Sequence, residues 1–136
     1  MIPAAFQYHS PDSVADAIDL LNTHGADAKI LAGGQSLIPM MKLRLADPQV
    51  IIDLGKISSM NYISQRDGGI AIGGMTTYEQ IESSNAVPSL LSETASSVAD
   101  VQVRNRGTIG GSLSHNDPAA DLPAAIIALG GEIITS

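Results

Sequence analysis

Two short glycine-rich segments hold the residues whose types and spacing could do chemistry in this 136-residue chain: Ala32-Gly33-Gly34-Gln35-Ser36 and Thr108-Ile109-Gly110-Gly111-Ser112. Consecutive backbone amides in such turns can form a concave nest for an anion, and glycine lets a ligand approach closely. Serine and threonine hydroxyls add further donors. Two such segments facing each other would hold a pyrophosphate from both sides. Two ordinary turns are an equal alternative, because neither segment fits the G-x-G-x-x-G or G-x-x-x-x-G-K-[ST] pattern.

The histidines and arginines form no second constellation in the sequence. His9, His24 and His115 fall in different predicted elements without the spacing of metal ligands. No G-x-S-x-G pattern surrounds any serine, so a nucleophile elbow is not expected. Arg104 and Arg106 flank the second glycine segment. They either steady it, contact a phosphate or are simply solvated, and the sequence leaves these alternatives open.

Composition restricts the classes of function. The formal net charge of -7 argues against a nucleic-acid binder, which normally carries a basic face. The chain has no cysteine, so it supplies no thiolate to an iron–sulfur cluster and forms no disulfide. The first residues lack a basic and then apolar signal pattern, and the longest apolar stretch, residues 122–129, is too short to span a bilayer. These features predict a cytoplasmic protein without a membrane span.

The first glycine segment needs an α/β unit to position it. Ser10 as N-cap and Pro11 at the first helical position predict a helix that ends at Gly25. Buried strands are expected at residues 29–32 and 50–54, with a short helix or irregular segment at 35–45 between them.

The second segment is expected among a hairpin and several helices. Asp67-Gly68 predicts the hairpin turn, and Thr76 with Glu79 resembles a capping box. Further helices are predicted from Pro88 to residue 98 and over 123–129, the latter capped by Asp121, with a loop at 100–106. A strand is expected at 132–135, and its position at the end of the chain predicts a chain cut inside a larger fold.

Three motifs, in order, resemble the FAD-binding medium subunit of molybdenum hydroxylases, the carbon-monoxide dehydrogenase and xanthine dehydrogenase family. The first is residues 32–39, AGGQSLIP, with Lys42-Leu43-Arg44 after it. The second is residues 72–78, IGGMTTY. The third is residues 103–113, VRNRGTIGGSL, followed by DPAADLP at 117–123. The resemblance covers the whole chain.

The resemblance implies an α+β, two-subdomain FAD-binding fold of the molybdopterin-dehydrogenase (PCMH-like) type. Residues 1–56 would form a small α/β subdomain, and residues 57–136 the first part of a larger α+β subdomain that is incomplete. FAD would lie between them. By resemblance, the cofactor-binding residues are Leu31, Ala32, Gly33, Gly34, Gln35, Ser36, Thr108, Ile109, Gly110, Gly111, Ser112 and Asp121.

The function implied by the resemblance is electron transfer. A large subunit with a molybdenum cofactor would oxidise substrate, and a small subunit would pass the electrons through two [2Fe–2S] clusters. The FAD held by this chain would then reduce an external acceptor. FAD carries the redox chemistry, so no catalytic residue and no metal ligand are expected here, and the oxidoreductase component would be inactive alone. Two alternatives remain: a truncated fragment or interaction module without cofactor, and another nucleotide-binding module.

Overall fold

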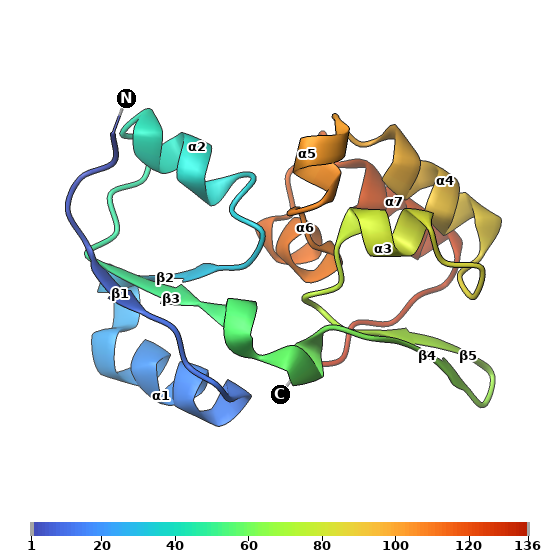
Figure 1. Cartoon of the computed structure of the whole chain (residues 1–136), viewed down its shortest axis with the longest axis horizontal. Helices are drawn as coiled ribbons and strands as arrows, with labels where there is room; N and C mark the ends of the chain where they lie inside the picture. Colours follow the sequence, from blue (N-terminus) through green and yellow to red (C-terminus); the bar gives the residue numbers. More distant parts are fainter. Residues whose placement is uncertain (1, 136) are drawn as a thin grey trace.

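A three-stranded parallel sheet organises the N-terminal lobe of the chain, of which the computed structural model describes residues 2–135. The strands β1 (Gln7–His9), β2 (Ala28–Leu31) and β3 (Val50–Asp53) lie in the order β1-β3-β2. The middle strand is apolar and buried, as is typical of a parallel sheet covered on both faces. Helix α1 (Val14–His24) packs on one face, and α2 (Leu37–Lys42) lies on the other side (Figure 1).

The start of α1 differs from the prediction. Its N-cap is Ser13 and not Ser10, because the Ser13 hydroxyl accepts a hydrogen bond from the Asp16 amide at 3.1 Å. Pro11 therefore precedes the helix and does not open it, while Gly25 ends the helix as predicted, with φ 52°. Strand β1 was not predicted, because its first two residues are exposed at the sheet edge and carry no apolar run.

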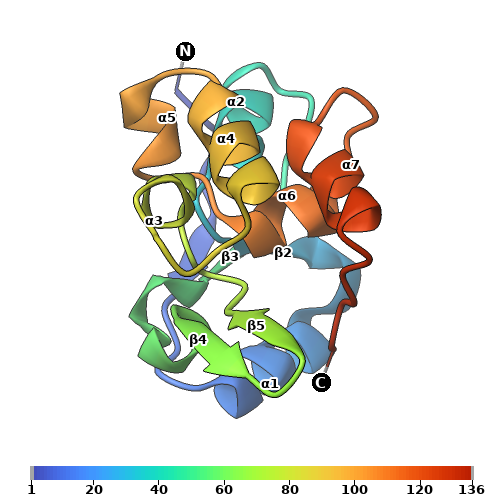
Figure 2. The same cartoon turned by 90° about the vertical axis from the view of Figure 1, so that its right-hand side faces the viewer.

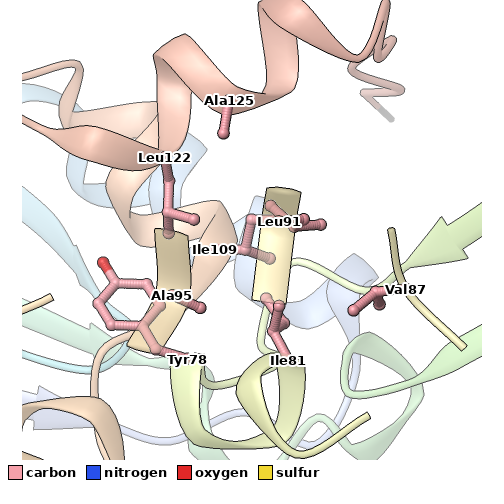
Figure 3. Packing of buried hydrophobic residues seen from close by; sticks show 8 residues of the cluster. All are labelled: Tyr78, Ile81, Val87, Leu91, Ala95, Ile109, Leu122 and Ala125. Carbon is pink, nitrogen blue, oxygen red and sulfur yellow. The ribbon is translucent and has the colours of Figure 1, made fainter. Parts of the chain in front are cut away.

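The C-terminal lobe combines one hairpin with five helices among the described residues. Strands β4 (Ile63–Arg66) and β5 (Gly69–Ile72) pair antiparallel around the predicted Asp67-Gly68 turn. The helices follow in order: α3 (Tyr78–Glu82), α4 (Ser89–Ser97), α5 (Val101–Arg104), α6 (Ile109–His115) and α7 (Asp121–Ala128). Figure 2 shows these helices gathered above the hairpin. Their apolar side chains meet in one core, where Tyr78, Ile109 and Leu122 converge (Figure 3).

The capping box at α3 is shifted by one residue from the prediction. Thr77 and Gln80 form it, not Thr76 and Glu79. Thr76 is fully buried, and its hydroxyl is bonded to the backbone of Tyr62 at 3.0 Å and 3.2 Å. A hydroxyl committed to another strand cannot cap the helix beside it.

Three further predictions for this lobe are wrong. Residues 101–104 form α5 and not a loop, because the Asp100 carboxylate accepts the Val103 amide at 2.9 Å and starts the helix. The N-cap of α7 is Ala120, so Asp121 is the first helical residue and its side chain makes no capping bond. Residues 132–135 form no strand and are exposed, since they have no neighbouring strand to pair with.

The chain passes between the lobes through two short 3-10 turns, Leu54–Lys56 and Ser58–Met60. Ile57 packs in the N-terminal core with Ala17 and Ile52, and Met60 contacts the same cluster. The boundary at residues 56 and 57 stays a prediction. Within residues 2–135, every helix falls short of the length and apolarity that crossing a membrane requires.

Candidate functional site

A cavity of about 750 Å³ lies between the two lobes. This volume is in the range of small-molecule and cofactor sites. Both glycine segments line it, one from each lobe, so the fold brings together residues that are more than 70 positions apart in the sequence. Ten of the predicted site residues are in its wall: Ala32, Gly33, Gly34, Gln35, Ser36, Thr108, Gly110, Gly111, Ser112 and Asp121. Leu31 and Ile109 are not; Leu31 ends β2, and Ile109 is buried in the core.

The two glycine segments touch. A Cβ atom on Gly33 would collide with the backbone carbonyl of Arg106, which lies just before the second segment. A Cβ atom on Gly111 would lie 3.6 Å from the Cβ of Ala32. Glycine is therefore needed at position 33 for the approach of one lobe to the other.

The first segment offers free hydrogen-bond donors. It leaves β2, bends at Gly34 with φ 77° and enters α2 at Leu37. Within the described chain, none of the four backbone amides from Gly33 to Ser36 donates a hydrogen bond to another protein group. All four residues line the cavity. A run of unpartnered amides beside a cavity is the feature that binds an anion without side-chain charge.

The second segment is a helix start and not a turn, and its amides are already used. Thr108 caps α6 and accepts the Gly111 amide at 3.2 Å. The Ile109 amide donates to the Thr76 carbonyl at 3.0 Å, and the Gly110 amide to the Gly74 carbonyl at 2.9 Å. A Cβ atom on Gly110 would lie 2.5 Å from that same Gly74 oxygen. Within residues 2–135, free amides are thus present in the first segment and not at 109–111.

Few charges face the cavity. The wall includes one lysine, Lys29, one histidine, His115, and two aspartates, Asp117 and Asp121, so the described wall has no excess of cationic side chains. Burial raises the pKa of Tyr78, and the Ser112 hydroxyl beside it lowers that pKa in part. Tyr78 is therefore a neutral phenol in the wall at neutral pH.

The remaining candidates lie apart or have structural roles. The His9 and His24 rings come within 5.4 Å of each other, and neither lines the cavity. The Arg104 guanidinium pairs with Glu82 at 2.8 Å and also lies outside the cavity wall.

Sequence reasoning missed the apolar part of the wall. Met40, Leu54 and Met60 line the cavity. Such residues have no distinguishing sequence pattern, because apolar side chains facing a cavity look like ordinary core residues.

The sequence of this chain matches a known protein family and resembles several characterised proteins. Residues 4–136 match the family described as the FAD binding domain in molybdopterin dehydrogenase. The carbon monoxide dehydrogenase medium chain of Hydrogenophaga pseudoflava is 48% identical over 132 residues, which are 95% of this chain and 46% of that protein. The xanthine dehydrogenase FAD-binding subunit of Escherichia coli O157:H7 is 34% identical over 119 residues, 84% of this chain and 40% of that protein.

Solved structures show the same likeness. A carbon monoxide dehydrogenase from Hydrogenophaga pseudoflava that lacks the Mo-pyranopterin moiety superimposes with a TM-score of 0.92 at 50% identity, covering 94% of this chain and 46% of that one. Quinoline 2-oxidoreductase from Pseudomonas putida 86 gives 0.87 at 39% identity, with coverages of 90% and 44%. These likenesses confirm the predicted fold class. The chain spans about half the length of the curated relatives it matches.

Proposed function

The chain belongs to the FAD-binding domain family of the molybdopterin dehydrogenases, and from that membership we propose that it binds FAD in the cavity between its lobes. The observation that carries this proposal is the meeting of the two glycine segments at one cavity, with four free backbone amides on one side. A diphosphate is doubly charged and needs such donors, since the described wall has no excess of cationic side chains.

The residues present fit the cofactor. The amides of Gly33 to Ser36 would hold the diphosphate, and the Ser112 hydroxyl would add a donor from the facing wall. Met40, Leu54 and Val98 would contact the apolar parts of FAD. The Asp121 carboxylate makes no capping bond and is free to accept from a ligand. When bound, FAD supplies the redox chemistry, and this chain binds and orients it.

Leu31 and Ile109 would support the site from behind the wall. Leu31 packs under the bend of the first segment, where its Cδ1 atom would lie 3.2 Å from a Cβ atom on Gly34. Ile109 anchors α6 in the core with Leu122 and Tyr78 (Figure 3). Their direct contact with FAD, like that of the other predicted site residues, stays a prediction.

For the whole protein we propose the role of the FAD-binding medium subunit of a molybdenum hydroxylase. Two of the relatives are named carbon monoxide dehydrogenase medium chain and xanthine dehydrogenase FAD-binding subunit, which supports this role. Electrons would come from a molybdenum cofactor in a large subunit, through [2Fe–2S] clusters in a small subunit, and leave to an external acceptor. These 136 residues include no cysteine and supply no cluster thiolate, which agrees with placing the clusters in the small subunit. A cytoplasmic location and inactivity of the chain alone belong to the same proposal.

Titration of the purified chain with FAD, followed by calorimetry and by flavin absorbance after gel filtration, tests the proposal. Saturable binding at one site, with ADP competing and NAD binding more weakly, is expected. Preferential retention of NAD would support another nucleotide-binding module, and retention of neither would support a fragment without cofactor. Either result would overturn FAD binding by this chain.

A further inference from the structure

The turn between α4 and α5 holds a strained residue at the edge of the cavity. Helix α4 ends at Ser97, and Val98 lines the cavity immediately after it. Ala99 then has φ 45°, in the left-handed region that residues with a Cβ atom rarely adopt. Strained backbone persists only where neighbouring groups hold it, and it clusters at ligand sites.

Arg104 is the group that holds this turn. Its Nη1 donates to the Val98 carbonyl at 3.2 Å and to the Ala99 carbonyl at 3.4 Å. Its Nε donates to the Glu82 carboxylate of α3 at 2.8 Å. The Arg104 side chain is only 15% exposed, and its bond to the Val98 carbonyl is part-buried. A planar guanidinium with several fixed donors can bridge three groups in this way, whereas an ammonium group cannot reproduce the geometry.

The same residue lies close to the contact between the lobes. Helix α5 ends at Arg104, and the carbonyl of Arg106, two residues later, meets Gly33 of the first glycine segment. Arg104 thus connects the cavity wall at Val98 with the place where the second lobe touches the first. It does not itself line the cavity, and its guanidinium is occupied by Glu82, so direct binding of a phosphate is not its role.

We propose that Arg104 is a positioning residue of the cofactor cavity, which fixes the strained Val98–Ala99 turn and thereby the wall against which the ligand binds. We call the hydrogen bonds from Arg104 to Val98, Ala99 and Glu82 the clamp. The inferred effect of the clamp on FAD binding rests on the proposed function.

Exchange of one side chain at a time tests the clamp in the full chain. Arg104→Lys keeps the positive charge but loses the planar set of guanidinium donors. Ala99→Gly removes the backbone strain at residue 99 and leaves Arg104 unchanged. Arg66→Lys, at an exposed position on the hairpin, is the matched control. Amide hydrogen exchange of residues 98–107 reports the clamp, because the amides of Val103 to Gly107 are hydrogen-bonded in the native turn. FAD affinity reports its effect on the cavity.

We expect Arg104→Lys to speed this exchange by about tenfold and to weaken FAD binding by a similar factor, the equivalent of releasing one strained residue. Adding Ala99→Gly should restore both, since glycine adopts this conformation without cost. Unchanged exchange in Arg104→Lys overturns the clamp. Weaker binding that Ala99→Gly does not restore also overturns it, since the guanidinium group would then affect FAD by a route other than the Val98–Ala99 turn. If the unmodified chain binds no FAD, the proposed function fails. The amide exchange rates then still show whether Arg104 holds the Val98–Ala99 turn.

Discussion

A negative charge at Ser36 should weaken binding of the cofactor while leaving the fold intact. Ser36 lines the cavity, is exposed and occupies the N-cap position of α2, where its side chain makes no capping bond. Aspartate is among the preferred residues at an N-cap, so Ser36→Asp should be neutral or slightly stabilising. It places a carboxylate beside the free amides of Gly33 to Ser36 that we assign to the diphosphate.

The magnitude follows from Coulomb's law. At about 6 Å, repulsion between the carboxylate and one phosphate charge is roughly 0.7 kcal/mol in a bulk-water dielectric and roughly 2.8 kcal/mol in that of a protein surface. Two phosphate charges therefore weaken binding by at least about 1.4 kcal/mol, or about tenfold in Kd. The loss should shrink in 1 M salt, where the Debye length falls to about 3 Å.

Calorimetric titration with FAD at low and high salt provides the assay, with thermal unfolding as the check on the fold. Ser89→Asp is the matched control, because it adds the same charge at the exposed start of α4, outside the cavity. Ser36→Ala separates charge from loss of the hydroxyl and should change Kd little. An unaltered Kd in Ser36→Asp, or a loss equal to that in Ser89→Asp, would refute the placing of the diphosphate at the first segment.

Three other changes should affect stability in specific ways. Gly33→Ala drives a methyl group into the Arg106 carbonyl and should destabilise by more than about 1 kcal/mol in urea unfolding, whereas Gly69→Ala, with open space around it, should be nearly neutral. Thr76→Val removes the acceptor of the part-buried Tyr62 amide, whereas the Tyr62 carbonyl keeps the Gly73 amide, and the change should cost about 1 kcal/mol by the same measurement. The pKa of Tyr78 is higher in the folded protein than in the unfolded chain. The contribution of Tyr78 ionisation to stability is therefore complete below about pH 10, the ordinary tyrosine pKa, and is lost as pH rises through the higher folded pKa. Tyr78→Phe should flatten the stability–pH curve above about pH 10.

The sequence was informative where local chemistry decides the structure. The VIID run of β3 is apolar enough to predict a buried strand, and Asp67-Gly68 predicts its hairpin turn correctly. It was less informative where distant contacts decide between equal local options. Thr76 and Thr77 are both suitable caps, and only the bonds from Thr76 to Tyr62, fourteen residues away, leave the capping role to Thr77.

For the candidate site, too, local chemistry could be predicted from the sequence and distant contacts could not. Residue types and spacing left two ordinary turns as an equal alternative, and the family resemblance predicted cofactor binding at both glycine segments; the structure places both at one cavity. Their individual roles depend on partners that no local pattern reveals. Gly110 makes room for the Gly74 backbone, and Gly33 makes room for Arg106. The apolar wall of the cavity and the strained backbone of Ala99 could not be predicted from local sequence either, because each depends on which other segment of the chain lies opposite.

These contacts indicate how an acidic chain would hold the proposed anion between two different walls. On the C-terminal side, the amides of Ile109 and Gly110 are bonded to Thr76 and Gly74, and the clamp at Arg104 holds the turn between α4 and α5, so protein hydrogen bonds form this wall without a ligand. On the N-terminal side, the amides of Gly33 to Ser36 have no protein partner among residues 2–135, so they are available to an anion. A preformed wall lowers the entropy cost of binding, while unpartnered donors supply the favourable interaction. Because Gly33 also forms the contact between the lobes, the approach of the lobes and the affinity for the ligand are determined by the same few backbone atoms.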